Sequence, residues 1–495
     1  MQSVLEVIQN RLKNTCLTGV LQVEKLSAIN ENKEKETMNT LRAPADRPNI
    51  ILINCDDMGY GDLECYGSRV NKTPHLSRVA TEGMRLTDFY MASPVCSPSR
   101  GAMMTGCYPR RIGFGSFDGA HVLFPGHAVG LNPSEITLPR ILKNNGYATQ
   151  MVGKWHCGDQ PDFLPTRHGF DNYFGLPYSN DMGRRPNGWQ PPLPLLRDEE
   201  VIQAQPDQAG LTERYVDESL QFIRAKQDQP FFLYFAHMHV HIPIYAPWRF
   251  LKSSINGPYG AAVECIDWSV GVLLHEIQRL GLDRNTLLIF TSDNGARGDR
   301  GGSNAPLRGR KATTWEGGLR VPCLLRWPGM IPSGQVSSEL ATSMDLLPTL
   351  ALWTGAKPPT DRPIDGRDLR SVFLAQPGAQ SPHEFFAYYL ADNLEAIRSG
   401  PWKYRFWKEG QPVRELFHLK DDIGESQNLY TKEPMVIRKL EAYAQQIRDD
   451  IGDALTNNPG RNCRPCGRVA NPRPLTEYQA DYPYLMAEYD LPDVG

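Results

Sequence analysis

Short apolar runs alternate along this chain with segments of helical periodicity, and this alternation most constrains the fold. The apolar runs occupy residues 48–54, 148–152, 231–235, 286–290 and 321–327. Segments with apolar residues at helical spacing lie between them, at residues 137–145, 213–226 and 259–280. Continuous apolar runs are typical of strands buried on both faces, and strands that alternate with helices form mainly parallel sheets. We therefore predict an α/β fold with a large, mainly parallel central sheet flanked by helices.

The length of 495 residues predicts a second, smaller domain. A segment rich in Pro, Asp and Gly at residues 355–367 indicates the exit from the large domain. Short strand-like pieces and a helical segment at 434–451 follow it, which is typical of a small α+β unit. We predict a weakly ordered leader at 1–47, a large domain at 48–378, and a smaller C-terminal α+β domain with a tail at 379–495.

Composition argues against two classes of partner. The formal net charge is −3, so the chain lacks the overall positive charge that attracts nucleic acid. No apolar stretch has the length that a membrane span requires. The polar leader lacks the apolar core of a signal peptide, so the sequence indicates no compartment. A homo-oligomer stays open.

Polar residues that carry chemistry follow four of the predicted strands. They are Asp56 and Asp57 after the first, Lys154 and His156 after the second, His237, His239 and His241 after the third, and Asp293 and Asn294 after the fourth. Each group alone is more often a solvated turn or a structural residue. In an open parallel sheet, however, ligands bind outside the carboxyl ends of the strands. We therefore predict that the four groups meet at one edge of the sheet.

Two features of this edge indicate a functional site: a set of metal-binding oxygens and a cysteine before a helix. The oxygens of Asp56, Asp57, Asp293 and Asn294 form a set that suits Ca²⁺ or Mg²⁺ better than zinc. Cys96 precedes a segment that can start a helix, and a helix N-terminus favours anions. A buried structural thiol and a plain thiolate nucleophile are the alternative interpretations of Cys96.

The segment around Cys96 carries a resemblance to a known family. Cys96-x-Pro98-Ser99-Arg100 with Thr105-Gly106 resembles the signature of the formylglycine-dependent sulfatases. Further matching stretches lie at residues 48–62, 153–156, 291–295, 316–318 and 415–419. Within that family the chain resembles arylsulfatase A and N-acetylgalactosamine-6-sulfatase. The resemblance implies an alkaline-phosphatase-like sandwich fold and a periplasmic, secreted or lysosomal location.

The resemblance also implies a mechanism. A formylglycine-generating enzyme would oxidise Cys96 to formylglycine, whose hydrate attacks sulfur with one hydroxyl and later expels sulfate with the help of the second. Ca²⁺, held by Asp56, Asp57, Asp293 and Asn294, would also touch the modified Cys96. Arg100 and Lys154 would orient the hydrate, and His156 would act as a base during sulfate release. His241 and Lys311 would bind sulfate or assist the leaving oxygen, and Ser179 would belong to the sulfate pocket.

Two positions depart from the family pattern. Cys107 stands where an arginine is usual, and that arginine helps the modifying enzyme to recognise the motif. Arg310 precedes Lys311 where glycine is usual, and it adds a charge beside the expected sulfate pocket.

The resulting prediction is a sulfuric ester hydrolase that acts on a sulfated saccharide or an aryl sulfate. Two alternatives stay open. One is a phosphoester or phosphonate hydrolase of the alkaline phosphatase superfamily, because the site suits either tetrahedral oxyanion. The other is a non-catalytic relative that binds sulfated glycans.

Overall fold

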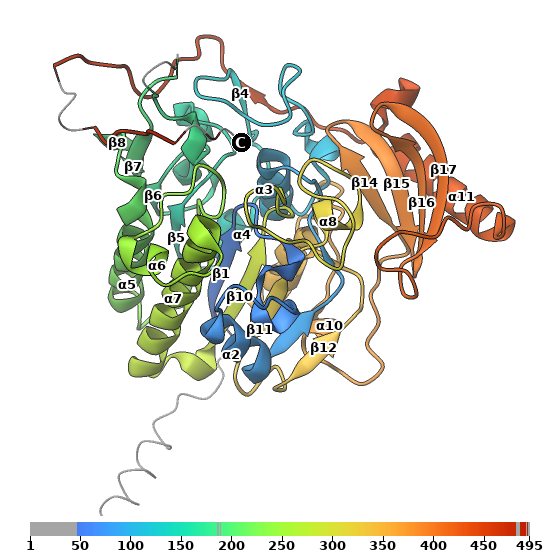
Figure 1. The fold of residues 1–495 in the computed structure, drawn as a ribbon, viewed down its shortest axis with the longest axis horizontal. Coiled ribbons are helices and arrows are strands. Elements are labelled where there is room, and N and C mark those ends of the chain that lie inside the picture. The colour runs from blue at the N-terminus through green and yellow to red at the C-terminus, as the bar shows by residue number, and fades with distance from the viewer. Residues whose placement is uncertain (1–46, 186–187, 189, 482–485, 492, 494–495) are drawn as a thin grey trace, which may run out of the picture.

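The structure is a computed structural model that describes residues 47–185, 188, 190–481, 486–491 and 493. The predicted leader therefore lies, apart from Arg47, outside the described residues. The centre of the molecule is a ten-stranded sheet in the order β12-β2-β11-β10-β1-β9-β5-β6-β7-β8 (Figure 1). Its strands are β1 (Asn49–Cys55), β2 (Met84–Leu86), β5 (Ala148–Gly153), β6 (Asn172–Gly175), β7 (Pro194–Arg197), β8 (Glu200–Ala204), β9 (Phe231–Ala236), β10 (Thr286–Ser292), β11 (Cys323–Arg326) and β12 (Gln335–Ser337).

The middle of the sheet is parallel, as the sequence predicts. Strand β1 pairs in parallel with β10 on one side and β9 on the other, and β9 pairs in parallel with β5. All seven residues of β1 are buried, which explains why this strand is a continuous apolar run. The sheet is mixed toward its edges, because β10–β11, β11–β2, β6–β7 and β7–β8 are antiparallel pairs.

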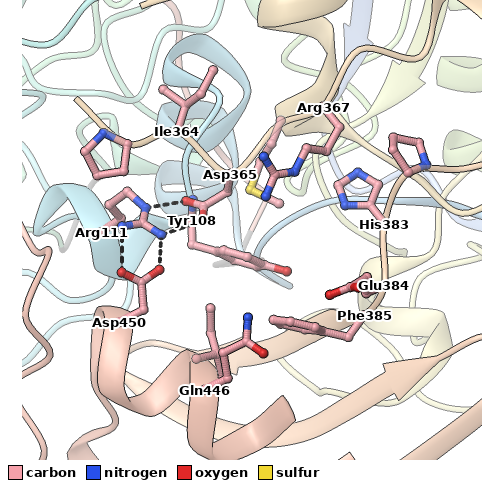
Figure 2. A pocket seen from close by; sticks show the side chains of 14 residues that line it. Tyr108, Arg111, Ile364, Asp365, Arg367, His383, Glu384, Phe385, Gln446 and Asp450 are labelled. Atoms are coloured by element: carbon pink, nitrogen blue, oxygen red, sulfur yellow. Dashed lines mark hydrogen bonds and ion pairs between the residues drawn. The ribbon is translucent and has the colours of Figure 1, made fainter. Parts of the chain in front are cut away.

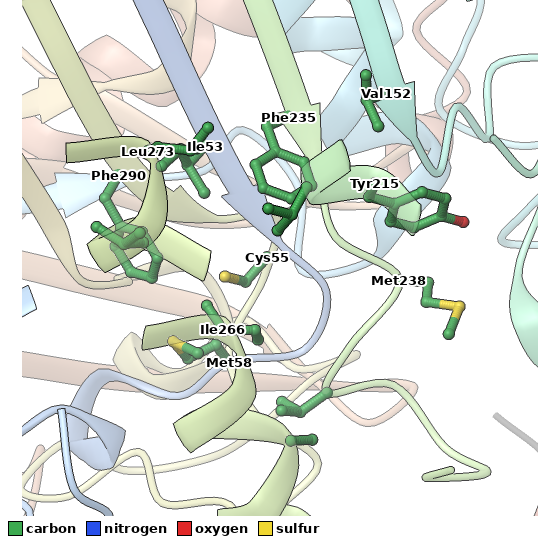
Figure 3. Close-up of a cluster of buried hydrophobic side chains, with 14 of the residues drawn as sticks. Ile53, Cys55, Met58, Val152, Tyr215, Phe235, Met238, Ile266, Leu273 and Phe290 are labelled. Carbon is green, nitrogen blue, oxygen red and sulfur yellow. The ribbon is translucent and has the colours of Figure 1, made fainter. Parts of the chain in front are cut away.

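Helices cover both faces of this sheet. They are α2 (Pro74–Glu82), α3 (Cys96–Thr105), α4 (Leu138–Asn144), α5 (Leu211–Ala225), α6 (Trp248–Leu251), α7 (Gly257–Arg279), α8 (Glu316–Leu319), α9 (Leu346–Trp353) and α10 (Arg370–Phe373). Alternate side chains of β1 enter two separate cores, as the period of two in a strand requires. Ile53 packs with Leu273 of α7, on the face shown in Figure 3. Leu52 belongs to the opposite core, together with residues of α3, α4 and α9.

A small antiparallel sheet forms the C-terminal domain beside the large sheet (Figure 1). Its strands follow one another in space as in the sequence: β14 (Phe386–Leu390), β15 (Asn393–Ser399), β16 (Trp402–Lys408) and β17 (Gln411–His418). Helix α11 (Pro434–Ile451) packs against β15 and β16 and has the bounds that the sequence predicts. The boundary at residues 378 and 379 stays a prediction.

Ion pairs connect this domain to the rest of the molecule. Arg111, just after α3, pairs with Asp450 of α11 at 2.5 Å and with Asp365 at 2.7 Å (Figure 2). The three residues line a cavity of about 630 Å³ between α11 and the segment 363–367. None of the predicted site residues lines this cavity.

The tail runs back over the large domain (Figure 1). Its strand β18 (Gly467–Arg468) pairs with β4 (Val129–Gly130), and Thr476 and Tyr489 are buried. Over the described ranges, no helix combines the length and apolar character needed to cross a membrane.

Candidate active site

The four groups of polar residues meet at the carboxyl edge of β5, β9, β1 and β10. The register aligns the ends of these strands, because Gly153 pairs with Ala236 and Cys55 pairs with Ser292. The residues that follow the strands are thereby placed side by side, as the sequence predicts. Asp57 and His156 leave their strands with positive φ angles of 62° and 58°. These turns hold the polar side chains at the edge of the sheet.

Cys96 is the first residue of α3 and lies at this same edge. Its side chain is buried, and its sulfur lies within 4.8 Å of carboxylate oxygens of Asp56 and Asp293. Burial raises the pKa of the Cys96 thiol to about 11, although the charges of Lys154 and Lys311 oppose the shift. An unmodified Cys96 is therefore a thiol at neutral pH, which argues against the interpretation as a plain thiolate nucleophile.

Arg100 lies one helical turn after Cys96 and faces the same cluster. Its Nε donates to Oδ2 of Asp293 at 2.8 Å, and its Nη1 donates to the carbonyl of Lys154 at 2.8 Å. The Arg100 side chain is about 1% exposed. The carboxylate of Asp293 and the carbonyl of Lys154 offset the cost of burying its charge. Arg100 thus connects α3 to the ends of β10 and β5.

The predicted metal ligands form a buried group with unsatisfied oxygens. Oδ1 of Asp56 and Oδ1 of Asn294 have no hydrogen-bond partner, although both atoms are buried. The amide of Asn294 donates to Oδ1 of Asp57 at 2.7 Å and so leaves its own oxygen available. Buried polar atoms without partners are costly unless a ligand satisfies them. This oxygen-only group fits a hard divalent cation such as Ca²⁺.

The carboxylates of this group differ in their electrostatic surroundings. Burial opposes the ionisation of Asp56, but the nearby charge of Lys154 holds its pKa well below the usual range. Burial, together with the charge of Asp56, raises the pKa of Asp293 to about 7. A divalent cation between these two carboxylates would favour ionisation of both.

Two lysines pair with different carboxylates of this group. Lys154 forms a short ion pair with Asp56 and donates to Oγ of Ser179 at 3.1 Å. Lys311 places Nζ 2.9 Å from Oδ2 of Asp57, and its side chain is 11% exposed. Burial opposes the charge of Lys154, but Asp56 raises the pKa of its ammonium group, so it stays charged. The cluster therefore presents two ammonium groups and one guanidinium.

His156 is held in one tautomer by a main-chain carbonyl. Its Nε2 lies 3.0 Å from the carbonyl oxygen of Leu123, so Nε2 carries the proton and Nδ1 carries the lone pair. Nδ1 is buried without a partner. Burial, and then the charge of Lys154, lower the pKa of His156 well below its usual value. His156 is therefore a neutral base at physiological pH.

The histidines after β9 occupy different places. Nδ1 of His241 lies 2.6 Å from the carbonyl oxygen of Ile242, which leaves Nε2 facing Asp57 at 3.8 Å. His239 contacts Asp56 through its main chain, since its carbonyl accepts a hydrogen bond from the amide of Asp56 at 3.0 Å. His237 lies 3.2 Å from Oγ of Ser269. Among the residues that the structure describes, His241 is the one of these three histidines whose ring lies within 4 Å of side chains in the cluster.

The structure adds contacts that the sequence did not predict. Leu123 belongs to a loop after α3; its amide donates to Oγ of Ser97 and its carbonyl fixes His156. Asp181 lies 4.0 Å from Nδ1 of His241. Neither residue carries a sequence signal, because a main-chain contact leaves no side-chain pattern and Asp181 follows no predicted strand.

The two departures from the family pattern have distinct surroundings. Cys107 is buried, and Nη2 of Arg464 lies 3.3 Å from its sulfur. Arg464 also pairs with Glu135 at 2.7 Å. A guanidinium from the tail therefore lies beside Cys107. Arg310 is exposed in a turn that its main chain closes with Thr313.

Comparisons with known proteins agree on one family. The sulfatase family model matches residues 48–356, and the model of the C-terminal domain of N-sulphoglucosamine sulphohydrolase matches residues 310–450. Human N-acetylgalactosamine-6-sulfatase is 43% identical over 378 residues, which cover 73% of this chain and 72% of that protein. Human arylsulfatase A is 37% identical over 473 residues, covering 85% and 92%. Mouse steryl-sulfatase is 38% identical over 460 residues, covering 77% and 72%.

Solved structures show the same fold. Ps i-CgsB in complex with k-i-k-neocarrahexaose superposes with a TM-score of 0.73 at 30% identity, covering 81% of this chain and 92% of that one. The phosphonate monoester hydrolase of Agrobacterium radiobacter shares the fold with a TM-score of 0.58 at 19% identity, covering 81% and 95%. These likenesses confirm the predicted alkaline-phosphatase-like architecture with a small C-terminal domain. The chain belongs to the formylglycine-dependent sulfatase family and is a sulfuric ester hydrolase.

Proposed function

We propose that this enzyme removes sulfate from sulfated saccharides, with Cys96 in its oxidised formylglycine form and Ca²⁺ held by Asp56, Asp57, Asp293 and Asn294. One observation carries the proposal. The sulfur of Cys96 lies at the N-terminus of α3, within 4.8 Å of carboxylate oxygens of Asp56 and Asp293. Oδ1 of Asp56 and Oδ1 of Asn294 are buried and have no hydrogen-bond partner. A nucleophile and a cation site therefore adjoin each other, an arrangement that suits metal-assisted transfer of a sulfate group.

The residues around Cys96 have complementary tasks in this proposal. Arg100 and Lys154 orient the nucleophile, since both contact carboxylates next to Cys96. His156 accepts a proton at Nδ1, because Leu123 holds the proton at Nε2. The bound cation would supply Lewis-acid stabilisation of negative charge on oxygen.

Two further residues lie where the substrate oxyanion would bind. Lys311 places an ammonium group beside Asp57, and His241 turns Nε2 toward the same carboxylate. We assign both to binding of the sulfate group or to protonation of the leaving oxygen. Ser179 accepts from Lys154 and lies 3.4 Å from His241, so it connects these two residues. These donors suit a transition state with charge on several oxygens.

The proposed substrate class rests on the relatives. Proteins named for N-acetylgalactosamine 6-sulfate and a structure in complex with k-i-k-neocarrahexaose are both similar to this chain. Arylsulfatase A and steryl-sulfatase are similar too, which makes small aryl and steryl sulfates the necessary comparison substrates. We expect higher kcat/KM on a sulfated saccharide than on either of them.

Two measurements test the proposal. The chain is produced together with a formylglycine-generating enzyme, and mass spectrometry of the peptide that contains Cys96 is expected to show the aldehyde. Sulfate release from defined galactose and N-acetylgalactosamine 4- and 6-sulfates is then measured, with Cys96→Ala as the inactive control. An unmodified Cys96 under these conditions, or equal activity of Cys96→Ala, contradicts the formylglycine mechanism.

Matched aryl phosphate and phosphonate esters separate the proposal from its alternatives. A lower kcat/KM on sulfate than on phosphate would favour a phosphoester hydrolase. Tight binding of a sulfated saccharide without sulfate release, by fully modified protein, would favour a glycan-binding protein.

A further inference from the structure

A buried cluster of six charged residues lies between the C-terminal domain and the large domain. It contains three acids and three bases: Asp88, Glu316, Glu425, Arg320, Arg398 and Lys403. Each of these side chains is at most 8% exposed. The equal numbers of charges make the cluster neutral as a whole, which is the condition for burying it.

Lys403 connects the two acids at the centre of this cluster. Its Nζ lies 3.0 Å from Oε1 of Glu316 and 2.8 Å from Oε1 of Glu425. Lys403 comes from β16 of the C-terminal domain, whereas Glu316 is the first residue of α8 in the large domain. The hydroxyl of Tyr388 donates to Glu316 at 2.7 Å. The first residue of α8 is therefore held by side chains of the C-terminal domain.

Glu425 holds the segment that contains Lys311 at both of its ends. The carboxylate of Glu425 accepts from the amide of Glu316 at 2.8 Å. The carbonyl of Glu425 accepts from Nη1 of Arg308 at 2.8 Å. Glu425 is fully buried and has a φ of 51°, a left-handed conformation that is unfavourable for a glutamate. The surrounding contacts therefore fix this residue firmly between residues 308 and 316.

The held segment and the α8 residues after it contact the main chain directly after the proposed metal ligand Asn294. The amide of Gly295, the residue after Asn294, donates to the carbonyl of Gly318 at 3.0 Å. A Cβ at Gly295 would lie 1.8 Å from the carbonyl oxygen of Gly317, so the two main chains touch. The amide of Lys311 donates to the carbonyl of Ala296 at 3.1 Å. A displacement of α8 would therefore move both Lys311 and Asn294.

We propose that Lys403 and Glu425 of the C-terminal domain are positioning residues that set the places of Lys311 and Asn294 in the active site. Loss of the Lys403 charge removes the cation that lies between Glu316 and Glu425, and Arg320, 3.5 Å from Glu316, stays on the side of Glu316 alone. The repulsion between the two glutamates, in a buried place, displaces the start of α8. This inference rests on the proposed function for its catalytic consequence, and its structural part stands independently of it.

The first test uses Lys403→Met, which keeps the length of the side chain and removes its charge. We expect calcium affinity, measured by isothermal titration calorimetry, and kcat/KM on the best saccharide sulfate each to fall roughly 10- to 100-fold, the usual cost of losing a residue that supports a metal site. Amide hydrogen exchange in the peptide covering 308–318 is expected to become faster. All measurements are made well below the Tm of the variant.

The matched control is Asp450→Asn, which removes the ion pair with Arg111, a connection between the domains away from Lys403 (Figure 2). This variant is expected to lower Tm while calcium affinity, KM and exchange in 308–318 stay as in the wild type. If Lys403→Met behaves as this control does, with a lower Tm alone, the proposal is wrong.

Glu425→Asp is a second variant that tests the positioning role without leaving an unpaired charge in the buried cluster. It conserves the charge balance but shortens the side chain, so one carboxylate cannot reach both Lys403 and the amide of Glu316. Faster exchange in 308–318 with weaker calcium binding supports the proposal, and wild-type values of both contradict it. Should the wild-type enzyme release no sulfate from any ester, the proposed function fails, while hydrogen exchange in the two variants still decides the positioning role.

Discussion

The guanidinium of Arg100 lies 2.8 Å from Oδ2 of Asp293, so the helix that begins at Cys96 is connected to the end of β10. Both side chains are almost fully buried. The nucleophile and the proposed metal ligands therefore share one rigid frame, and a change at Arg100 is expected to affect both.

The first prediction concerns this connection. Arg100→Lys keeps the charge, but one ammonium group cannot contact both Asp293 and the carbonyl of Lys154 at the distances of the guanidinium. We expect kcat to fall by ~100-fold, because orientation of the nucleophile is lost. Steady-state kinetics on an aryl sulfate measures it, and mass spectrometry of the Cys96 peptide must show equal modification in both proteins. A change of KM alone would contradict the assigned role.

The second prediction concerns the cation. The unsatisfied oxygens of Asp56 and Asn294 imply that Ca²⁺ binds the folded state better than the unfolded chain. Free Ca²⁺ at 100 times Kd is expected to stabilise the protein by about 2.7 kcal/mol. Differential scanning calorimetry in EGTA and in Ca²⁺ measures the shift in Tm.

Asn294→Ala is the variant for this test. It removes one ligand oxygen and also the amide donor to Asp57, and it is expected to reduce the calcium-dependent shift strongly. A shift of the same size in this variant would show that Ca²⁺ binds elsewhere.

Much of this architecture follows from local patterns in the sequence. The strand at β1 and the helix at α11 are visible because a short, Ile-rich apolar run favours a buried strand and a regular helical period favours a helix. The placing of Asp56 and Asp293 follows from one rule, since parallel neighbouring strands bring their carboxyl ends together. The sequence does not indicate the antiparallel strand β8, because that strand is largely exposed and carries no apolar period.

The parts of the site that the sequence does not predict depend on contacts between distant segments. Glu425 accepts from an amide 109 residues earlier, and Arg464 reaches a sulfur 357 residues earlier. Leu123 acts through its carbonyl, which every residue type possesses. No periodicity or local motif records such pairings, so only the folded chain reveals them.

The third prediction concerns substrate selection by Arg310. This residue is exposed and precedes Lys311, and its turn is fixed to the Cys96 segment because the amide of Ala312 donates to the carbonyl of Pro94 at 2.9 Å. We expect Arg310→Gln to raise KM several-fold for a disulfated saccharide, since one charge-assisted hydrogen bond is lost. A monosulfated aryl ester serves as the control substrate and should keep its KM, and Arg310→Lys should retain most of the preference. Equal changes on both substrates would contradict a role in selection.

The fourth prediction concerns the pH dependence of stability. Burial lowers the pKa of His168 to about 3, and burial with the charge of His239 lowers that of His237 to about 3. In the unfolded chain both imidazoles take up protons near the usual pKa of about 6.5, whereas in the folded protein they stay neutral. The unfolded state therefore binds more protons as pH falls from about 6.5 toward 3, and each histidine removes roughly 1.4 kcal/mol of stability per pH unit in that window.

The variant for this test is His168→Phe, which keeps an aromatic ring beside Trp155. In urea titrations between pH 6 and 4.5, it should lower the slope of the unfolding free energy against pH by the contribution of one bound proton. Above about pH 7.5 the difference between variant and wild type should be constant, because neither state of the wild type is protonated there. An unchanged slope below pH 6 would mean that His168 is protonated in the folded protein as readily as in the unfolded chain.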